Sequence, residues 1–133
     1  MAPRIRHIAI CAEDVPALAA FYRHTFGLKE VARQQSDDGF AIYLTDGYIN
    51  LAILPSPKAG PPGINHLGFE VEDVREIARL AKEAGAQTGI APRPRDGRYA
   101  EFRLHDPVGT PVDLSEHGWK VEEGAGLAET SAS

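Results

Sequence analysis

The stretch "GINHLGFEVEDV", residues 63–74, is the second copy of a pattern with which the chain begins. The first copy is "RIRHIAICAEDV", residues 4–15. A shift of 66 − 7 = 59 residues lays His7 on His66 and one Glu-Asp-Val on the other. A repeat with a period of about sixty residues predicts that the two halves of the chain fold as the same supersecondary unit.

A shorter match closes each half. "INL" at residues 49–51 resembles "VDL" at residues 112–114, and this pairs Asn50 with Asp113 at a shift of 113 − 50 = 63 residues. Because this shift is only slightly longer than the first one, we expect the internal loops of the two halves to differ by a few residues.

The first half predicts a β-α-β-β-β unit. Residues 4–11 alternate between two faces, as a strand does. Asp14 can cap a helix that Gly27 ends. For the first half we expect a helix at 15–26 and further strands at 27–34, 39–46 and 48–55. For the second half we expect a strand at 64–71, a helix at 74–84, a weakly marked strand near 87–91, and strands at 98–106 and 111–117.

The alternation of each strand also predicts which side chains share a face. Leu51 and Ile53 are expected to pack under the first helix, which turns Asn50 to the other side of its strand. Phe102 and Leu104 are expected to pack under the second helix in the same way. The opposite, concave face then collects most of the polar residues, namely His7, Tyr48, Asn50, His66, Glu101, Arg103 and Asp113.

Length and charge limit the kinds of protein that this chain can be. Its 133 residues are long enough for one domain with a real core. We expect that domain at 1–119, with modules at about 4–54 and 63–116 and a flexible tail at 120–133. The net charge of −5 argues against a nucleic-acid partner. One cysteine and no long apolar run favour a cytoplasmic protein without a membrane span.

These residues together resemble the vicinal oxygen chelate superfamily, which includes glyoxalase I, methylmalonyl-CoA epimerase, extradiol dioxygenases and bleomycin-resistance proteins. The resemblance lies in "IRHIAI" followed by "FYRHTFGL", in "INHLGFEVEDV" and in "DPVGTPVDLSE". It implies an α+β fold in which two tandem βαβββ modules form an open, eight-stranded, cup-shaped mixed sheet with the helices on its outer face. It also implies a homodimer with a metal inside the cup, and the matching ligand positions are His7, Asn50, His66 and Asp113.

The chemistry of these side chains agrees with three of the four positions. Two imidazoles and a carboxylate form a site for a divalent ion such as Zn, Fe, Mn, Co or Ni, with coordination positions left open for substrate. Two residues depart from the pattern of the family, because Asp113 stands where glutamate is usual and Asn50 stands where glutamate or glutamine is frequent. Asn50 is a neutral, weak ligand, so the sequence predicts a site of three ligands plus one.

The resemblance suggests an enzyme, namely a metal-dependent lyase or isomerase of the glyoxalase and epimerase type that acts on a small, oxygen-chelating substrate. The base would be Glu101 or a hydroxide supplied by the metal, and Arg103 and Tyr48 would contact the substrate. Two alternatives stay open. One is an iron-dependent ring-cleaving dioxygenase that uses the same histidines and carboxylate. The other is a metal-free protein that sequesters a drug or metabolite.

Overall fold

The computed structural model describes residues 2–37, 39–93 and 100–118. Contacts divide these residues into two units. The N-terminal unit comprises residues 7–65, and the C-terminal unit joins residues 2–6 to residues 66–118. The predicted tail at 120–133 lies outside the described residues, so the predicted domain boundary stays a prediction.

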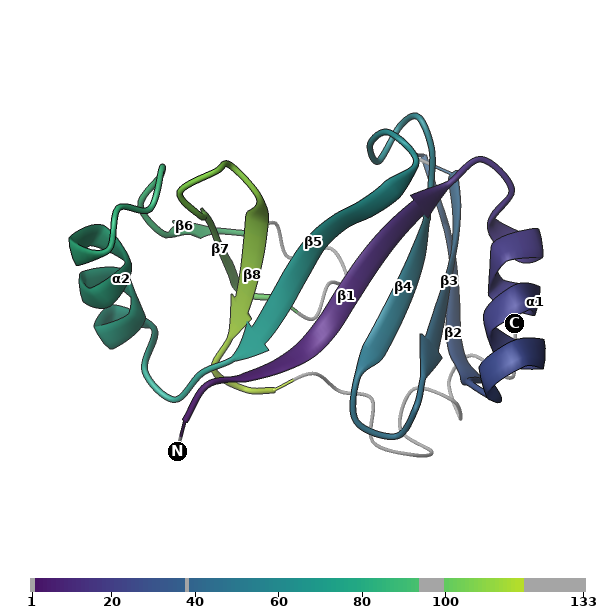
Figure 1. Ribbon diagram of the computed structural model, residues 1–133, viewed down its shortest axis with the longest axis horizontal. Coiled ribbons are helices and arrows are strands. Elements are labelled where there is room, and N and C mark those ends of the chain that lie inside the picture. The colour runs from purple at the N-terminus through teal and green to yellow at the C-terminus, as the bar shows by residue number, and fades with distance from the viewer. Residues whose placement is uncertain (1, 38, 94–99, 119–133) are drawn as a thin grey trace. The chain divides into compact units, whose positions relative to one another are not determined.

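The N-terminal unit is a β-α-β-β-β module, as predicted (Figure 1). The expected caps fix the ends of its helix: the side chain of Asp14 accepts a hydrogen bond from the backbone N–H of Ala17 at 3.0 Å, and Gly27 ends the helix with φ 74°. The elements of this module are β1 (Arg4–Ala12), α1 (Val15–Phe26), β2 (Lys29–Ser36), β3 (Gly39–Thr45) and β4 (Asn50–Pro55).

One face of these strands forms the core of the N-terminal unit against α1. Strand alternation places every second apolar residue on this face, and the helix contributes two small side chains. The buried residues of this cluster are Val15, Ala19, Ile42, Leu44, Leu51 and Ile53. The opposite face of β1 and β4 is therefore left to the polar residues, as the sequence predicted.

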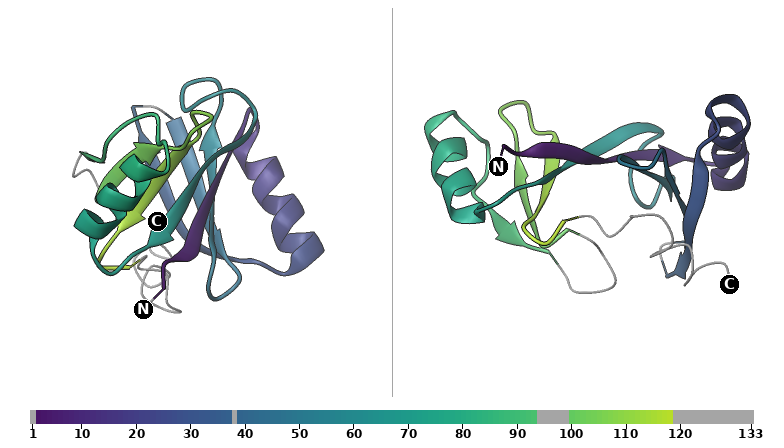
Figure 2. Two further views of the ribbon diagram at one scale, coloured as in Figure 1. Left: turned by 60° about the vertical axis from the view of Figure 1, so that its left-hand side comes forward. Right: turned by 90° about the horizontal axis from the view of Figure 1, so that it is seen from below.

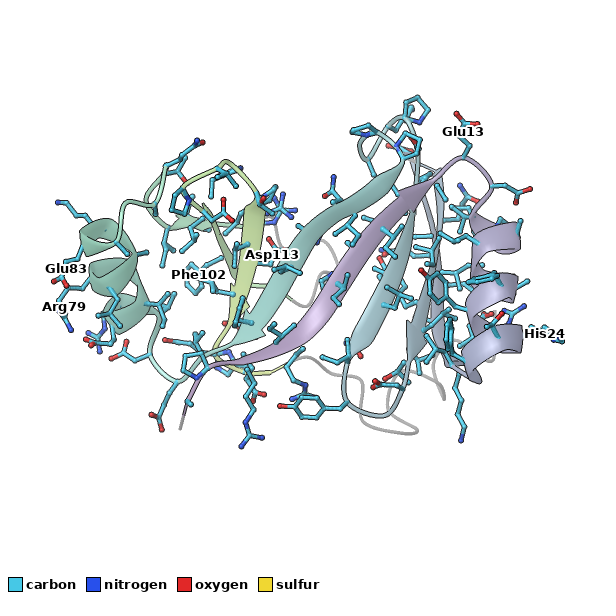
Figure 3. The ribbon with its side chains drawn as sticks, in the orientation of Figure 1. Glu13, His24, Arg79, Glu83, Phe102 and Asp113 are labelled. Atoms are coloured by element: carbon cyan, nitrogen blue, oxygen red, sulfur yellow. The ribbon has the colours of Figure 1, made fainter. Side chains whose placement is uncertain are left out.

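The C-terminal unit repeats the module with a smaller core (Figure 2). Its helix is capped from two places, because Asp73 accepts from the N–H of Arg75 at 2.9 Å and Glu116 accepts from the N–H of Val74 at 2.7 Å. The elements are β5 (Gly63–Glu70), α2 (Val74–Glu83), β6 (Ala91–Pro92), β7 (Phe102–His105) and β8 (Pro111–Ser115). Phe102 lies on the side of β7 that faces α2 (Figure 3).

The hydrogen-bonded strand order is β2-β3-β4-β1-β5-β8-β7-β6, an eight-stranded mixed sheet. β1 is parallel to β4 and β5 is parallel to β8, while the hairpin partners within each module are antiparallel. This order confirms the predicted α+β fold of two tandem βαβββ modules with an open sheet.

Two strands of the second module are shorter than the sequence suggested. The strand expected near 87–91 is only the two residues of β6, and β7 begins at Phe102, although we expected a strand from 98. Pro92 and Pro94 explain the first difference, because proline lacks the N–H that a sheet ladder needs. Residues 94–99 lie outside the described residues. Among the described helices, none is long and apolar enough to cross a membrane.

Replacing Ile53 with alanine is expected to destabilise the protein by about 2–5 kcal/mol, because Ile53 is fully buried under α1 and its loss leaves a cavity. Chemical denaturation followed by circular dichroism measures this change. Ile64→Ala is the matched control, because Ile64 is a strand isoleucine that is 72% exposed, and its stability should change by less than about 0.5 kcal/mol. Equal effects of the two variants would contradict the assignment of the core.

Candidate functional site

His7 and Asn50 lie opposite each other in the N-terminal unit. β1 and β4 run parallel, with His7 in register with Asn50, so that the two side chains share one face. This face is turned away from α1, because their strand neighbours Ile8 and Leu51 pack toward the helix. Both polar residues are buried, with 6% of His7 and 1% of Asn50 exposed.

The amide group of Asn50 is the most unusual polar group of this unit. Neither its Oδ1 nor its Nδ2 has a hydrogen-bond partner among the described residues. The neighbouring hydroxyl of Thr45, in register with Asn50, donates to the carbonyl of Ile49 at 3.0 Å and accepts from the N–H of Gly47 at 3.0 Å. Because a buried amide without a partner costs free energy, this position favours a bound group that interacts with the amide.

His66 and Asp113 come together in the C-terminal unit. The Nε2 atom of His66 lies 3.4 Å from Oδ2 of Asp113, and both side chains are less than a tenth exposed. Asp113 is in register with Gly68, two residues after His66, so the carboxylate reaches His66 diagonally across β5 and β8. A strict repeat of the first module would have placed Asp113 directly opposite His66, as Asn50 is opposite His7.

Arg103 holds both oxygens of Asp113. The two residues are direct cross-strand partners in β7 and β8. Nε of Arg103 donates to Oδ1, and Nη2 donates to Oδ2 at 3.1 Å, which is the two-pronged geometry in which guanidinium and carboxylate bind most strongly. The side chain of Arg103 is 20% exposed. The predicted substrate contact is therefore already engaged by a predicted metal ligand.

Glu101 is tied to the end of β8. Its Oε1 accepts a hydrogen bond from the N–H of Glu116 at 3.0 Å, and its Oε2 contacts Nδ1 of His117. The side chain is 28% exposed, whereas that of His117 is 76% exposed. Glu101 thus lies two residues before Arg103 but interacts with the chain beyond Asp113.

Two other residues on the predicted face have simpler surroundings. Tyr48 lies in the turn between β3 and β4, where its N–H donates to Asp46 Oδ1 at 2.8 Å, and it is 39% exposed. Cys11 is 2% exposed, and burial raises the pKa of its thiol above the ordinary value. A buried thiol with a raised pKa is a poor nucleophile at neutral pH.

The structure thus brings the predicted site residues together in two groups, one in each unit. The N-terminal unit holds His7 with Asn50, and the C-terminal unit holds His66 with Asp113 and Arg103. Taken over its described residues, neither unit by itself gathers three His, Cys, Asp or Glu side chains able to hold a metal ion. The metal site therefore stays a prediction.

The Arg103–Asp113 pair is the interaction that sequence reasoning missed. Both residues were placed on one face, but their register across the β7–β8 hairpin was not worked out. A signal was present, because His105 and Pro111 close the hairpin loop, and counting two residues outward from each reaches Arg103 and Asp113. The loop length alone would have given this pair once the last strand pair was known.

The comparisons with known proteins agree with this architecture. Residues 4–114 match the model of the Glyoxalase/Bleomycin resistance protein/Dioxygenase superfamily. This match spans most of the 133 residues, and the chain belongs to that superfamily.

One curated relative and two solved structures define its surroundings within the family. The chain is 31% identical over 114 residues to an ethylmalonyl-CoA/methylmalonyl-CoA epimerase of Cereibacter sphaeroides, which covers 76% of this chain and 85% of the relative. A hypothetical protein from Bacillus halodurans C-125 superposes with a TM-score of 0.70 at 21% identity, covering 92% of this chain and 100% of that one. A methylmalonyl-CoA epimerase of Streptomyces coelicolor, crystallised with 2-nitronate-propionyl-CoA, has a TM-score of 0.61 at 25% identity and covers 84% and 94%.

Proposed function

We propose that the protein is a metal-dependent epimerase that removes and returns a proton at a carbon flanked by a carboxylate and a thioester carbonyl. Such a substrate presents two neighbouring oxygens that can chelate one cation. The 31% identity to an ethylmalonyl-CoA/methylmalonyl-CoA epimerase supports this reaction class within the superfamily. The observation in the structure that carries the proposal is the buried Asn50 amide, without a hydrogen-bond partner among the described residues and in register with His7.

The residues fit a divalent cation by their chemistry. Two imidazoles, His7 and His66, and the Asp113 carboxylate are ligands that such ions accept, and the Asn50 oxygen would complete the set. The buried amide of Asn50 gains a partner in this arrangement, which removes an energetic cost. The proposal requires that both units contribute ligands to one site. A divalent ion, when bound, supplies Lewis acidity that stabilises negative charge developing on the substrate oxygens.

Glu101 is the proposed proton acceptor. It is a carboxylate on the same strand face as Arg103, and its side chain is only partly exposed. Its Oε2 contacts His117, a mobile-length side chain that is mostly exposed, so this contact can be given up when a substrate binds. The hydrogen bond from the N–H of Glu116 to Oε1 keeps the carboxylate in place during the transfer.

Exchange of a carbon-bound proton with solvent deuterium tests the proposal directly. Protein loaded with Zn, Mn, Fe, Co or Ni is mixed with methylmalonyl-CoA in D₂O, and the loss of the signal of the C2 proton is followed by NMR. We expect exchange with at least one metal and a return to the background rate after treatment with a chelator. Metal-loaded protein that leaves this proton at the background rate with every metal would refute the proposed reaction.

We also propose that the protein forms a homodimer. The hydrogen-bonded order ends with β2 and β6, and the outer edges of such strands tend to be covered in stable proteins. Light scattering at micromolar concentration is expected to give twice the mass of the chain, which is 14.4 kDa. A mass of one chain under these conditions would contradict the dimer.

A further inference from the structure

The Asp113 carboxylate is engaged at both oxygens by a residue that is not itself a metal ligand. Arg103 donates to Oδ1 through Nε and to Oδ2 through Nη2, and Asp113 is 5% exposed. Both residues belong to the C-terminal unit and are direct partners across β7 and β8, so the sheet itself fixes the pair. Any cation that uses Asp113 must share its carboxylate with this guanidinium.

We propose that Arg103 controls metal loading at the site and is passed on to the substrate when the metal binds. In the state described here, the guanidinium neutralises Asp113. A divalent ion that binds the same carboxylate weakens this pair, because two positive groups then lie close together away from bulk water. The inference rests on the proposed function and adds to it a residue that sets metal affinity and selects anionic substrates.

The charges explain why the released guanidinium would turn to the substrate. Asp113 contributes one negative charge, whereas the divalent ion and Arg103 together contribute three positive ones. A substrate carboxylate reduces this excess, and the planar guanidinium can bind it through two parallel hydrogen bonds. Metal and carboxylate should therefore strengthen each other's binding, and such coupling acts equally in both directions.

The first module offers an internal contrast. Asn50 lies in register with Thr45, whose hydroxyl is used within its own turn. The corresponding hairpin of the second module pairs Asp113 with Arg103. Competition from a fixed cation thus acts on the carboxylate ligand alone, while the Asn50 amide has no hydrogen-bond partner among the described residues.

The test is the affinity of the whole protein for Zn²⁺ and Mn²⁺, measured by competition with a coloured chelator. Arg103→Met removes the charge and keeps much of the side-chain length. We expect the dissociation constant to fall about tenfold or more, the equivalent of one charge-assisted hydrogen bond no longer given up. Arg79→Met is the matched control, because Arg79 pairs with Glu83 on the exposed side of α2, and its affinity should equal that of the parent. Malonate should tighten Zn²⁺ binding in the parent and not in Arg103→Met.

The outcomes separate this inference from the proposed function. Unchanged or weaker metal binding by folded Arg103→Met, or equal tightening by malonate in both proteins, overturns the role of Arg103 while the epimerase proposal stands. Metal binding by Arg103→Met alone supports the role of Arg103 and overturns metal dependence in the parent. If the variant does not fold, NMR of the parent decides: the Nε–H resonance of Arg103, assigned by its loss in Arg103→Lys, should shift when Zn²⁺ is added. A resonance that stays in place overturns the inference.

Discussion

Protein carrying His66→Ala is expected to retain no stoichiometric divalent metal after equilibration with Zn, Mn, Fe, Co and Ni and removal of the excess. His66 is one of three strong ligands of the proposed site, and an open site that loses one of three loses most of its affinity. Its side chain is 8% exposed and its Nε2 lies 3.4 Å from Asp113, so no other part of this residue's surroundings replaces the imidazole. Elemental analysis of the purified protein, expressed per chain, measures the effect.

His24→Ala is the matched control for this experiment. His24 projects from α1 into solvent, away from the strands (Figure 3), and its replacement should leave the metal content unchanged. His7→Ala should lose the metal as His66→Ala does, because the proposal needs a ligand from each module. Asn50→Ala should only weaken binding, since an amide oxygen is a poor ligand. A parent protein without metal, or His66→Ala with as much metal as the parent, would leave His66 as a buried histidine and favour a sequestering protein.

Glu101→Gln is expected to slow deuterium exchange at C2 of methylmalonyl-CoA by about 10²- to 10⁴-fold, the usual contribution of a positioned general base. Glutamine keeps the Oε1 atom that accepts the hydrogen bond from the N–H of Glu116, so the end of β8 should stay in place. The change removes only the ability to take up a proton. Exchange rates of metal-loaded parent and variant are compared by NMR, and the metal content of both is measured to show that it is equal.

His117→Ala separates a base from a structural carboxylate. It removes the contact of Glu101 with His117 and leaves the carboxylate. If Glu101 acts as the base, this variant exchanges at least as fast as the parent. If Glu101 only holds the end of β8 through His117, both variants should lose thermal stability to a similar degree while the exchange rate per folded molecule stays constant. That result would move the role of base to another group.

Local sequence determined the elements and the faces of this protein. The caps of α1, Asp14 and Gly27, lie where the sequence put them, because capping depends on a few neighbouring residues. The alternation of β1 and β4 correctly predicted that His7 and Asn50 share the face opposite α1. The 59-residue repeat likewise predicted two equal modules, since each copy carries the same apolar pattern.

Only the tertiary structure decided the register between strands. Side chains alternate with a period of two, so sliding a strand by two residues keeps every residue on its face and leaves the sequence pattern unchanged. The pattern could therefore place Asp113 on the correct face, but it could not tell whether His66 or Gly68 lies opposite it. The same freedom hid the pairing of Arg103 with Asp113. The geometry of the β7–β8 loop and the packing of both strands against α2 remove it, and these depend on residues far apart in the chain.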